Sequence, residues 1–146
     1  MSFAGPPGLC AMTNSTQATT LKNIGVAMFT ISDQDAAIAF YTDKLGFELR
    51  ADVTFGENGD MRWVEVAPPG STARLALNPP MFDEPGGSGI GVETTDVLGE
   101  YDRLAAIGGL DLDPRPTGST PGAPLMFMLR DPDGNTVVVV EEAPAS

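Results

Sequence analysis

Apolar positions along the chain follow a pattern that predicts a strand and then a helix. Residues 24–31 (IGVAMFTI) are apolar at nearly every position, which is typical of a strand buried on both faces. Ser32 or Asp33 is placed to cap a helix, and Gly46 is placed to end it. The helix has one apolar stripe at helical spacing, formed by Ala37, Ile38, Tyr41 and Leu45.

Three shorter strands complete the first unit. They are predicted at residues 47–53, 61–66 and 72–78. The order of elements is therefore β-α-β-β-β. Residues 79–88 (PPMFDEPGGS) are dense in proline and glycine, and this composition predicts a linker.

The same order of elements begins again after the linker. A strand at 89–94 precedes Asp96, which is placed to cap a second helix ended by Gly108 and Gly109. The expected apolar side of that helix comprises Val97, Leu98, Tyr101, Leu104 and Ala105. Weaker strand signal covers 110–112, and clear strands cover 124–129 and 136–141. Asp33 matches Asp96 at an offset of 63 residues, and Gly46 matches Gly109 at the same offset, which indicates an internal repeat.

The repeat defines the expected architecture. Neither unit is large enough to bury its own faces, so two units must pack together. We predict an α+β domain spanning residues 21–142, in which tandem βαβββ modules (21–80 and 87–142) form a curved mixed sheet. This sheet would make a cup with the helices outside. Residues 1–20 are rich in Gly, Pro, Ser and Thr and are expected to form a flexible leader; whether translation starts at Met1 or Met12 stays open.

Two motifs resemble those of a known family. Residues 40–47 (FYTDKLGF) resemble its first-helix signature FYxxxLGF, and residues 127–141 (FMLRDPDGNTVVVVE) resemble its closing hairpin. Together with the repeat, they make residues 22–142 similar to the vicinal oxygen chelate superfamily, which contains glyoxalase I, extradiol dioxygenases and bleomycin-resistance proteins. The resemblance implies a glyoxalase-like fold and a homodimer. We interpret Asp131 and Asp133 in the closing hairpin as turn residues.

The resemblance also implies a metal site, which this sequence does not match. Family enzymes hold a divalent metal with four side chains, one from the first and one from the last strand of each module. The corresponding residues here are Val26, Gly89, Val138 and, within one residue, Ala76. None of them can ligate a metal, the chain has no histidine, and its one cysteine, Cys10, falls in the expected leader. We therefore expect neither metal nor cofactor; an oxygen-only site built from Glu65 and Glu93 is the less favoured alternative.

The predicted ligand-binding residues come from strand alternation, on the assumption that the positions equivalent to the family's metal ligands face the cup. They are Val26, Met28, Thr30, Trp63, Arg74, Asn78, Glu93 and Val138. Trp63 offers a stacking surface, although such a residue also serves as plain core. Arg74 and Glu93 either orient a ligand, pair with each other or face solvent. Which of Met126, Phe127 and Met128 face the cup stays open at this point.

The net charge of the chain limits the classes of partner that it is expected to bind. The formal net charge is −12, which disfavours nucleic acid and anionic membrane surfaces, and no apolar run is long enough to span a bilayer. A cytoplasmic location is the default expectation. We favour a metal-free protein that sequesters an apolar or aromatic small molecule, with a cationic ligand as one option that the acidic surface suits. The alternatives are a metal-independent lyase or isomerase, with Glu93 or Glu65 as acid or base and Arg74 holding an anion, and a non-catalytic interaction module.

Overall fold

The computed structural model describes residues 18–81, 83–118 and 123–142. The first module contains β1 (Val26–Thr30), α1 (Gln34–Ala39), a π-helical turn η1 (Phe40–Lys44), β2 (Glu48–Phe55), β3 (Met61–Ala67) and β4 (Arg74–Asn78). The second contains β5 (Gly89–Thr94), α2 (Val97–Ile107), β6 (Asp111–Leu112), β7 (Met126–Arg130) and β8 (Thr136–Glu141). Most of the expected leader, including Cys10 and Met12, lies outside the described residues. Within the described ranges, no helix combines the length and apolar character needed to cross a membrane.

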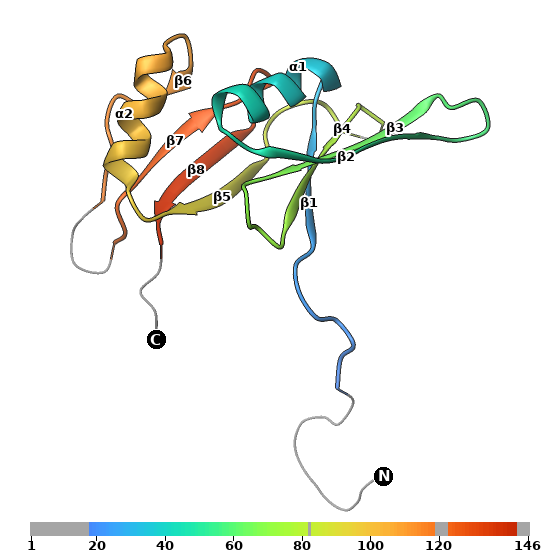
Figure 1. The fold of residues 1–146 in the computed structure, drawn as a ribbon, viewed down its shortest axis with the longest axis horizontal. Coiled ribbons are helices and arrows are strands. Elements are labelled where there is room, and N and C mark those ends of the chain that lie inside the picture. The colour runs from blue at the N-terminus through green and yellow to red at the C-terminus, as the bar shows by residue number, and fades with distance from the viewer. Residues whose placement is uncertain (1–17, 82, 119–122, 143–146) are drawn as a thin grey trace, which may run out of the picture.

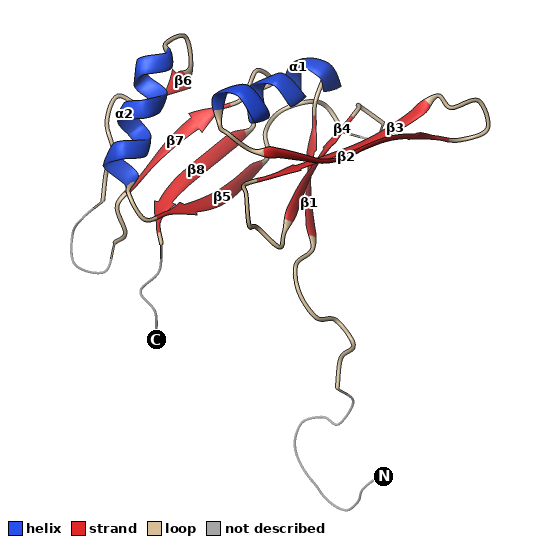
Figure 2. Ribbon diagram, in the orientation of Figure 1, coloured by secondary structure: helices blue, strands red, loops and turns tan. Residues whose placement is uncertain are grey.

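Each module forms its own four-stranded mixed sheet. The strand orders are β1-β4-β3-β2 and β5-β8-β7-β6. The first strand of each module pairs in parallel with the last one, and the other neighbours are antiparallel. Figure 2 shows the two sheets as separate groups of strands. The predicted α+β class with two βαβββ modules is confirmed.

The repeat extends to the chemistry of the helix ends. The backbone N–H of Ala36 donates to the carboxylate of Asp33 (3.1 Å), and that of Gly99 donates to Asp96 (2.9 Å). Both aspartates are the N-caps of their helices. Gly46 and Gly109, which follow the two helices, have φ angles of 79° and 76°, a conformation that side chains with a Cβ resist.

The core lies between the helices and one face of each sheet. Both helices lie on the same side of the strands (Figure 1). The largest fully buried side chains come from both modules: Phe29, Ile31, Tyr41, Val64, Val66, Leu77, Leu104, Phe127, Leu129 and Val137. Because Phe127 belongs to this core, its neighbours Met126 and Met128 point to the opposite face, which answers the question left open by the sequence.

Burial of β1 on both faces was predicted and is wrong. Phe29 is buried, but its neighbour Met28 is 58% exposed. The helices cover only one face of the sheet, so alternate residues of β1 are left uncovered within the chain. The expected apolar side of α2 needs a similar correction, because Leu98 is 57% exposed while Leu104 is buried.

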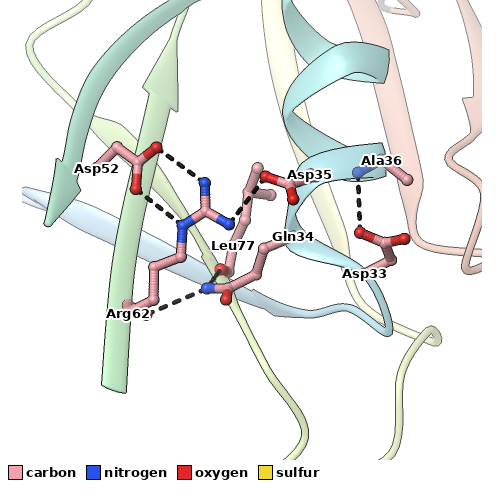
Figure 3. A network of polar contacts seen from close by, with 7 residues as sticks. All are labelled: Asp33, Gln34, Asp35, Ala36, Asp52, Arg62 and Leu77. Atoms are coloured by element: carbon pink, nitrogen blue, oxygen red, sulfur yellow. Dashed lines mark hydrogen bonds and ion pairs between the residues drawn. The ribbon is translucent and has the colours of Figure 1, made fainter. Parts of the chain in front are cut away.

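A polar network fixes α1 to the first sheet (Figure 3). The side-chain amide of Gln34 donates to the backbone carbonyls of Arg62 (3.1 Å) and Leu77 (3.0 Å). The guanidinium of Arg62 pairs with Asp52 on β2 and with Asp35 on α1. The hydrogen bond from Arg62 lowers the pKa of the Asp52 carboxyl below its ordinary value. One arginine thus links two strands and a helix.

The turn between β7 and β8 connects the two modules. One oxygen of Asp131 accepts from the backbone N–H groups of Asp133 and Asn135, and the other accepts from the hydroxyl of Tyr41. The side-chain amide of Asn135 also donates to the carbonyl of Thr30, at the end of β1 (3.3 Å). The interpretation of this motif as a turn agrees with these contacts, which in addition give it the role of joining the modules.

Candidate functional site

The face of each sheet that turns away from the helices forms the candidate site, which we call the open face. In the first sheet, strand alternation and register assign it Val26, Met28, Thr30, Ala51, Val53, Phe55, Met61, Trp63, Glu65, Arg74, Ala76 and Asn78. In the second sheet they assign it Gly89, Gly91, Glu93, Met126, Met128, Arg130, Thr136, Val138 and Val140. All eight residues predicted from the sequence to bind a ligand thus belong to the open face.

The strand register places the four positions that correspond to metal ligands in family enzymes. Ala76 pairs with Met28 in the first sheet, and Val138 pairs with Gly91 in the second. Met28 and Gly91 are separated by the same 63 residues as the two helix caps, so Ala76 is the structural equivalent of Val138. The uncertainty of one residue in the sequence comparison is removed.

The side chains at these positions do not fit a divalent metal. Alanine, valine and glycine offer no side-chain nitrogen, oxygen or sulfur donor. Across the described parts of the chain, no group of three or more His, Cys, Asp or Glu side chains is arranged to hold an ion. The side chains at these four positions therefore supply no ligand for a metal.

A polar cluster stands on the open face of the first sheet. The carboxylate of Glu65 accepts from Nε of Arg74 (2.8 Å) and from Nε1 of Trp63 (2.9 Å). Glu65 is only 9% exposed, and a buried carboxylate needs such partners. The cluster comes from neighbouring strands, because β3 carries Trp63 and Glu65 while β4 carries Arg74.

The partner of Arg74 differs from the one considered in the sequence. Pairing of Arg74 with Glu93 was one alternative, but Arg74 pairs with Glu65 and Glu93 is exposed. In the sequence, Glu65 was a possible acid, base or oxygen ligand, with pairing to an unspecified arginine as the ordinary alternative. The available signal was weak: Trp63 and Glu65 share one face by alternation, but the position of β4 beside β3 was not readable from the sequence.

Two cavities flank the open face. The first, of about 610 Å³, is lined by Met28, Thr30 and Asn78 together with linker residues, among them Met81, Asp83 and Glu84. The second, of about 670 Å³, lies where the two modules meet; its lining combines Arg74, Gly91 and Glu93 with residues of the opposite face such as Leu75 and Val92. Val26, Trp63 and Val138 line neither cavity. The contribution of the linker was not foreseen from the sequence, since its composition indicated only a connection.

Comparison with known proteins gives consistent matches over most of the chain. Residues 23–139 match the family model described as the Glyoxalase/Bleomycin resistance protein/Dioxygenase superfamily. The uncharacterized protein YetH of Bacillus subtilis (strain 168) is 31% identical over 124 residues, which cover 83% of this chain and 99% of YetH.

Solved structures give the same result. A member of the glyoxalase/bleomycin resistance protein/dioxygenase superfamily from Sphaerobacter thermophilus DSM 20745 is 34% identical, with a TM-score of 0.75 over 85% of this chain and 100% of that one. TnmS3, an antibiotic binding protein from Streptomyces sp. CB03234, is 28% identical, with a TM-score of 0.73 over 86% of this chain and all of TnmS3.

Proposed function

Because this chain belongs to the glyoxalase/bleomycin resistance protein/dioxygenase superfamily, we propose that it binds and sequesters an apolar or aromatic small molecule on its open face without a metal. Its similarity to TnmS3, an antibiotic binding protein, supports a binding role over a catalytic one. We place this activity in the cytoplasm.

One observation carries the proposal. At the four positions where family enzymes supply metal ligands, this chain has aliphatic or glycine residues, namely Val26, Ala76, Gly89 and Val138. These residues supply apolar surface and space instead of donor atoms. A surface of that kind, with a few fixed polar groups beside it, is the usual makeup of a small-molecule binding site.

The geometry gives less support to an enzyme. Glu65, one candidate acid or base, already accepts hydrogen bonds at both carboxylate oxygens, from Trp63 and Arg74, which hold it in place. Glu93, the other candidate, is exposed to solvent. Neither carboxylate is thus held ready for proton transfer in the manner that general acid–base catalysis requires.

The exposed part of the open face supports a homodimer as a component of the proposal. Met28, Val53 and Phe55 are 58%, 54% and 48% exposed, and all three belong to this face. Exposed apolar residues gathered on one face are typical of a protein–protein or ligand contact. A second copy of the chain that covers part of this face would enclose the ligand from the other side.

A thermal-shift screen with mass spectrometry tests the proposed function. The protein is heated with a panel of aromatic antibiotics and neutral polycyclic compounds, and each stabilising compound is then recovered. A ligand at one hundred times its dissociation constant adds about 2.7 kcal/mol to the free energy of unfolding. Sequestration predicts stabilisation by compounds that are recovered unchanged. Conversion of a stabilising compound into a product, or the absence of any response across the panel, contradicts it.

A further inference from the structure

One arginine of the open face has unused hydrogen-bond donors. Arg74 donates from Nε to Glu65, while its two terminal nitrogens, Nη1 and Nη2, have no hydrogen-bond partner within the described parts of the chain. The Arg74 side chain is 39% exposed, and it lines the cavity of about 670 Å³. A guanidinium with a free terminal fork therefore belongs to the lining of a space large enough for a small molecule.

The other arginines of the folded part show how unusual this arrangement is. Arg130, the arginine on the open face of the second sheet, uses Nη1 for Asp113 and Nη2 for Asp111. The terminal nitrogens of three further arginines also donate to described carboxylates or carbonyls, as in Arg50, Arg62 and Arg103. Arg115 is exposed in the loop after β6. Arg74 thus combines a held side chain with an unoccupied fork.

Glu65 fixes the direction of that fork. Its bond to Nε occupies one edge of the planar guanidinium, while the end formed by Nη1 and Nη2 has no partner within the described parts of the chain. This end matches two oxygens of a planar carboxylate, or one anionic oxygen placed between the nitrogens. Because the Glu65 side chain is only 12% exposed, water competes little for the pair, and the arginine keeps its orientation without a ligand.

The same carboxylate also holds an aromatic side chain of the open face. Nε1 of Trp63 donates to Oε2 of Glu65, which restrains the indole ring, and the register of β3 and β4 places Trp63 and Arg74 on opposite sides of Glu65. An indole face binds flat rings by offset stacking. A single buried glutamate therefore orients both a cation and a stacking surface.

From the free fork we infer that the apolar or aromatic ligand of the proposed function carries an anionic oxygen group, a carboxylate or an acidic phenol, which binds Nη1 and Nη2 of Arg74. The inference rests on the proposed function and specifies its ligand class. The net charge of −12 acts at long range and is screened over about 8 Å at physiological ionic strength. The Nη1–Nη2 fork of Arg74 acts on the ligand at hydrogen-bond distance, so it determines the preference for an anionic group.

Three matched probes test the ligand class by calorimetric titration: 2-naphthoate, its neutral isostere 2-naphthamide, and the cationic 2-naphthylmethylammonium. The naphthoate is expected to bind about tenfold or more tightly than the amide, as charge-assisted hydrogen bonds require. In Arg74→Gln the naphthoate should bind no better than the amide, while the amide keeps its wild-type affinity. Arg115→Gln serves as the matched control, because it removes the same charge from an exposed loop outside the open face, and it should keep the preference.

Arg74→Gln leaves the buried carboxylate of Glu65 without its charged partner, so a second variant is needed in which this carboxylate is also removed. The double substitution Glu65→Gln with Arg74→Gln removes both charges of the pair, and it should also lose the preference for naphthoate. Equal affinity of wild type for naphthoate and amide, tighter binding of the ammonium, or a preference retained in Arg74→Gln would overturn the inference while leaving sequestration in place. Failure of all three probes to bind wild type contradicts both the inference and the proposed function.

Discussion

The hydroxyl of Tyr41, in the first module, donates a 2.9 Å hydrogen bond to the carboxylate of Asp131, in the second. Tyr41 is fully buried and Asp131 is 4% exposed. The same oxygen of Asp131 also accepts from the side-chain amide of Asn135 (3.1 Å), but a buried carboxylate that loses one donor has no water to replace it. This pair is therefore a main polar connection between two modules that form separate sheets.

Replacement of Tyr41 by phenylalanine should lower the free energy of unfolding by about 1–3 kcal/mol, the cost of leaving a buried charged acceptor short of a donor. Urea denaturation measures the change. Tyr101→Phe provides the control, because the Tyr101 hydroxyl donates to a neutral backbone carbonyl, that of Asp113, and its loss should cost less. A smaller loss for Tyr41→Phe than for Tyr101→Phe would show that the Tyr41–Asp131 pair does not join the modules.

The same contact predicts a dependence of stability on alkaline pH. Burial, and then the negative charge of Asp131, raise the pKa of Tyr41 far above its ordinary value of about 10. The folded protein keeps the Tyr41 hydroxyl protonated, whereas the unfolded chain loses that proton above pH 10. The contribution of Tyr41 is thus complete below pH 10 and declines above it, by about 1.4 kcal/mol per pH unit.

Unfolding free energies measured by urea denaturation between pH 8 and pH 11.5 test this decline. Wild type should lose stability with the extra slope above pH 10, and Tyr41→Phe should lack that extra slope because its side chain does not ionise. Parallel pH curves for the two proteins would contradict the assignment.

The helix caps give a prediction about the repeat itself. Asp33→Ala and Asp96→Ala each remove the side-chain acceptor at a helix start, and each should cost about 1 kcal/mol of stability. Asp102→Ala, an exposed position within α2, should change little. Thermal or urea denaturation of the three variants measures the effects. If Asp33→Ala or Asp96→Ala costs no more stability than Asp102→Ala, that aspartate does not stabilise its helix, and the two modules differ at this position.

These caps also illustrate what the sequence predicts well. Asp33, Gly46, Asp96 and Gly109 act through bonds and backbone angles within their own turns, so their spacing was enough to predict both helices and the repeat. The strands were predicted for the same reason, since apolar runs bounded by turn residues are a local property. Local chemistry thus supplied the modules and their order.

The errors arose where the outcome depends on contacts between distant segments. The apolar run of β1 indicated burial on both faces, yet Met28 is exposed because the helices cover one face only. The partner of Arg74 depends on β4 lying beside β3, which no local pattern specifies. Apolar residues that the core does not use are better explained by a ligand or a second copy of the chain.

The proposed dimer makes a prediction for two adjacent residues on β2. Phe55→Glu places a charge on the open face, whereas Thr54→Glu places one on the other face of the same strand. Light scattering should give wild type and Thr54→Glu about twice the 15.2 kDa of one chain, and Phe55→Glu a smaller mass. A wild-type mass of one chain, or an unchanged mass for Phe55→Glu, would contradict a dimer through this face.

The most direct test of metal-free sequestration uses Gly91, which lines the larger cavity and where an added Cβ meets nothing within 4 Å. The affinity of EDTA-treated protein for 2-naphthamide is measured for wild type, for Gly91→Leu and for Ala105→Leu, an exposed control on α2. We predict that wild type and Ala105→Leu bind equally and that Gly91→Leu, with its cavity partly filled, binds about tenfold more weakly or worse. Binding that requires added zinc, iron, nickel or manganese, or that is unaffected by Gly91→Leu, would contradict the account.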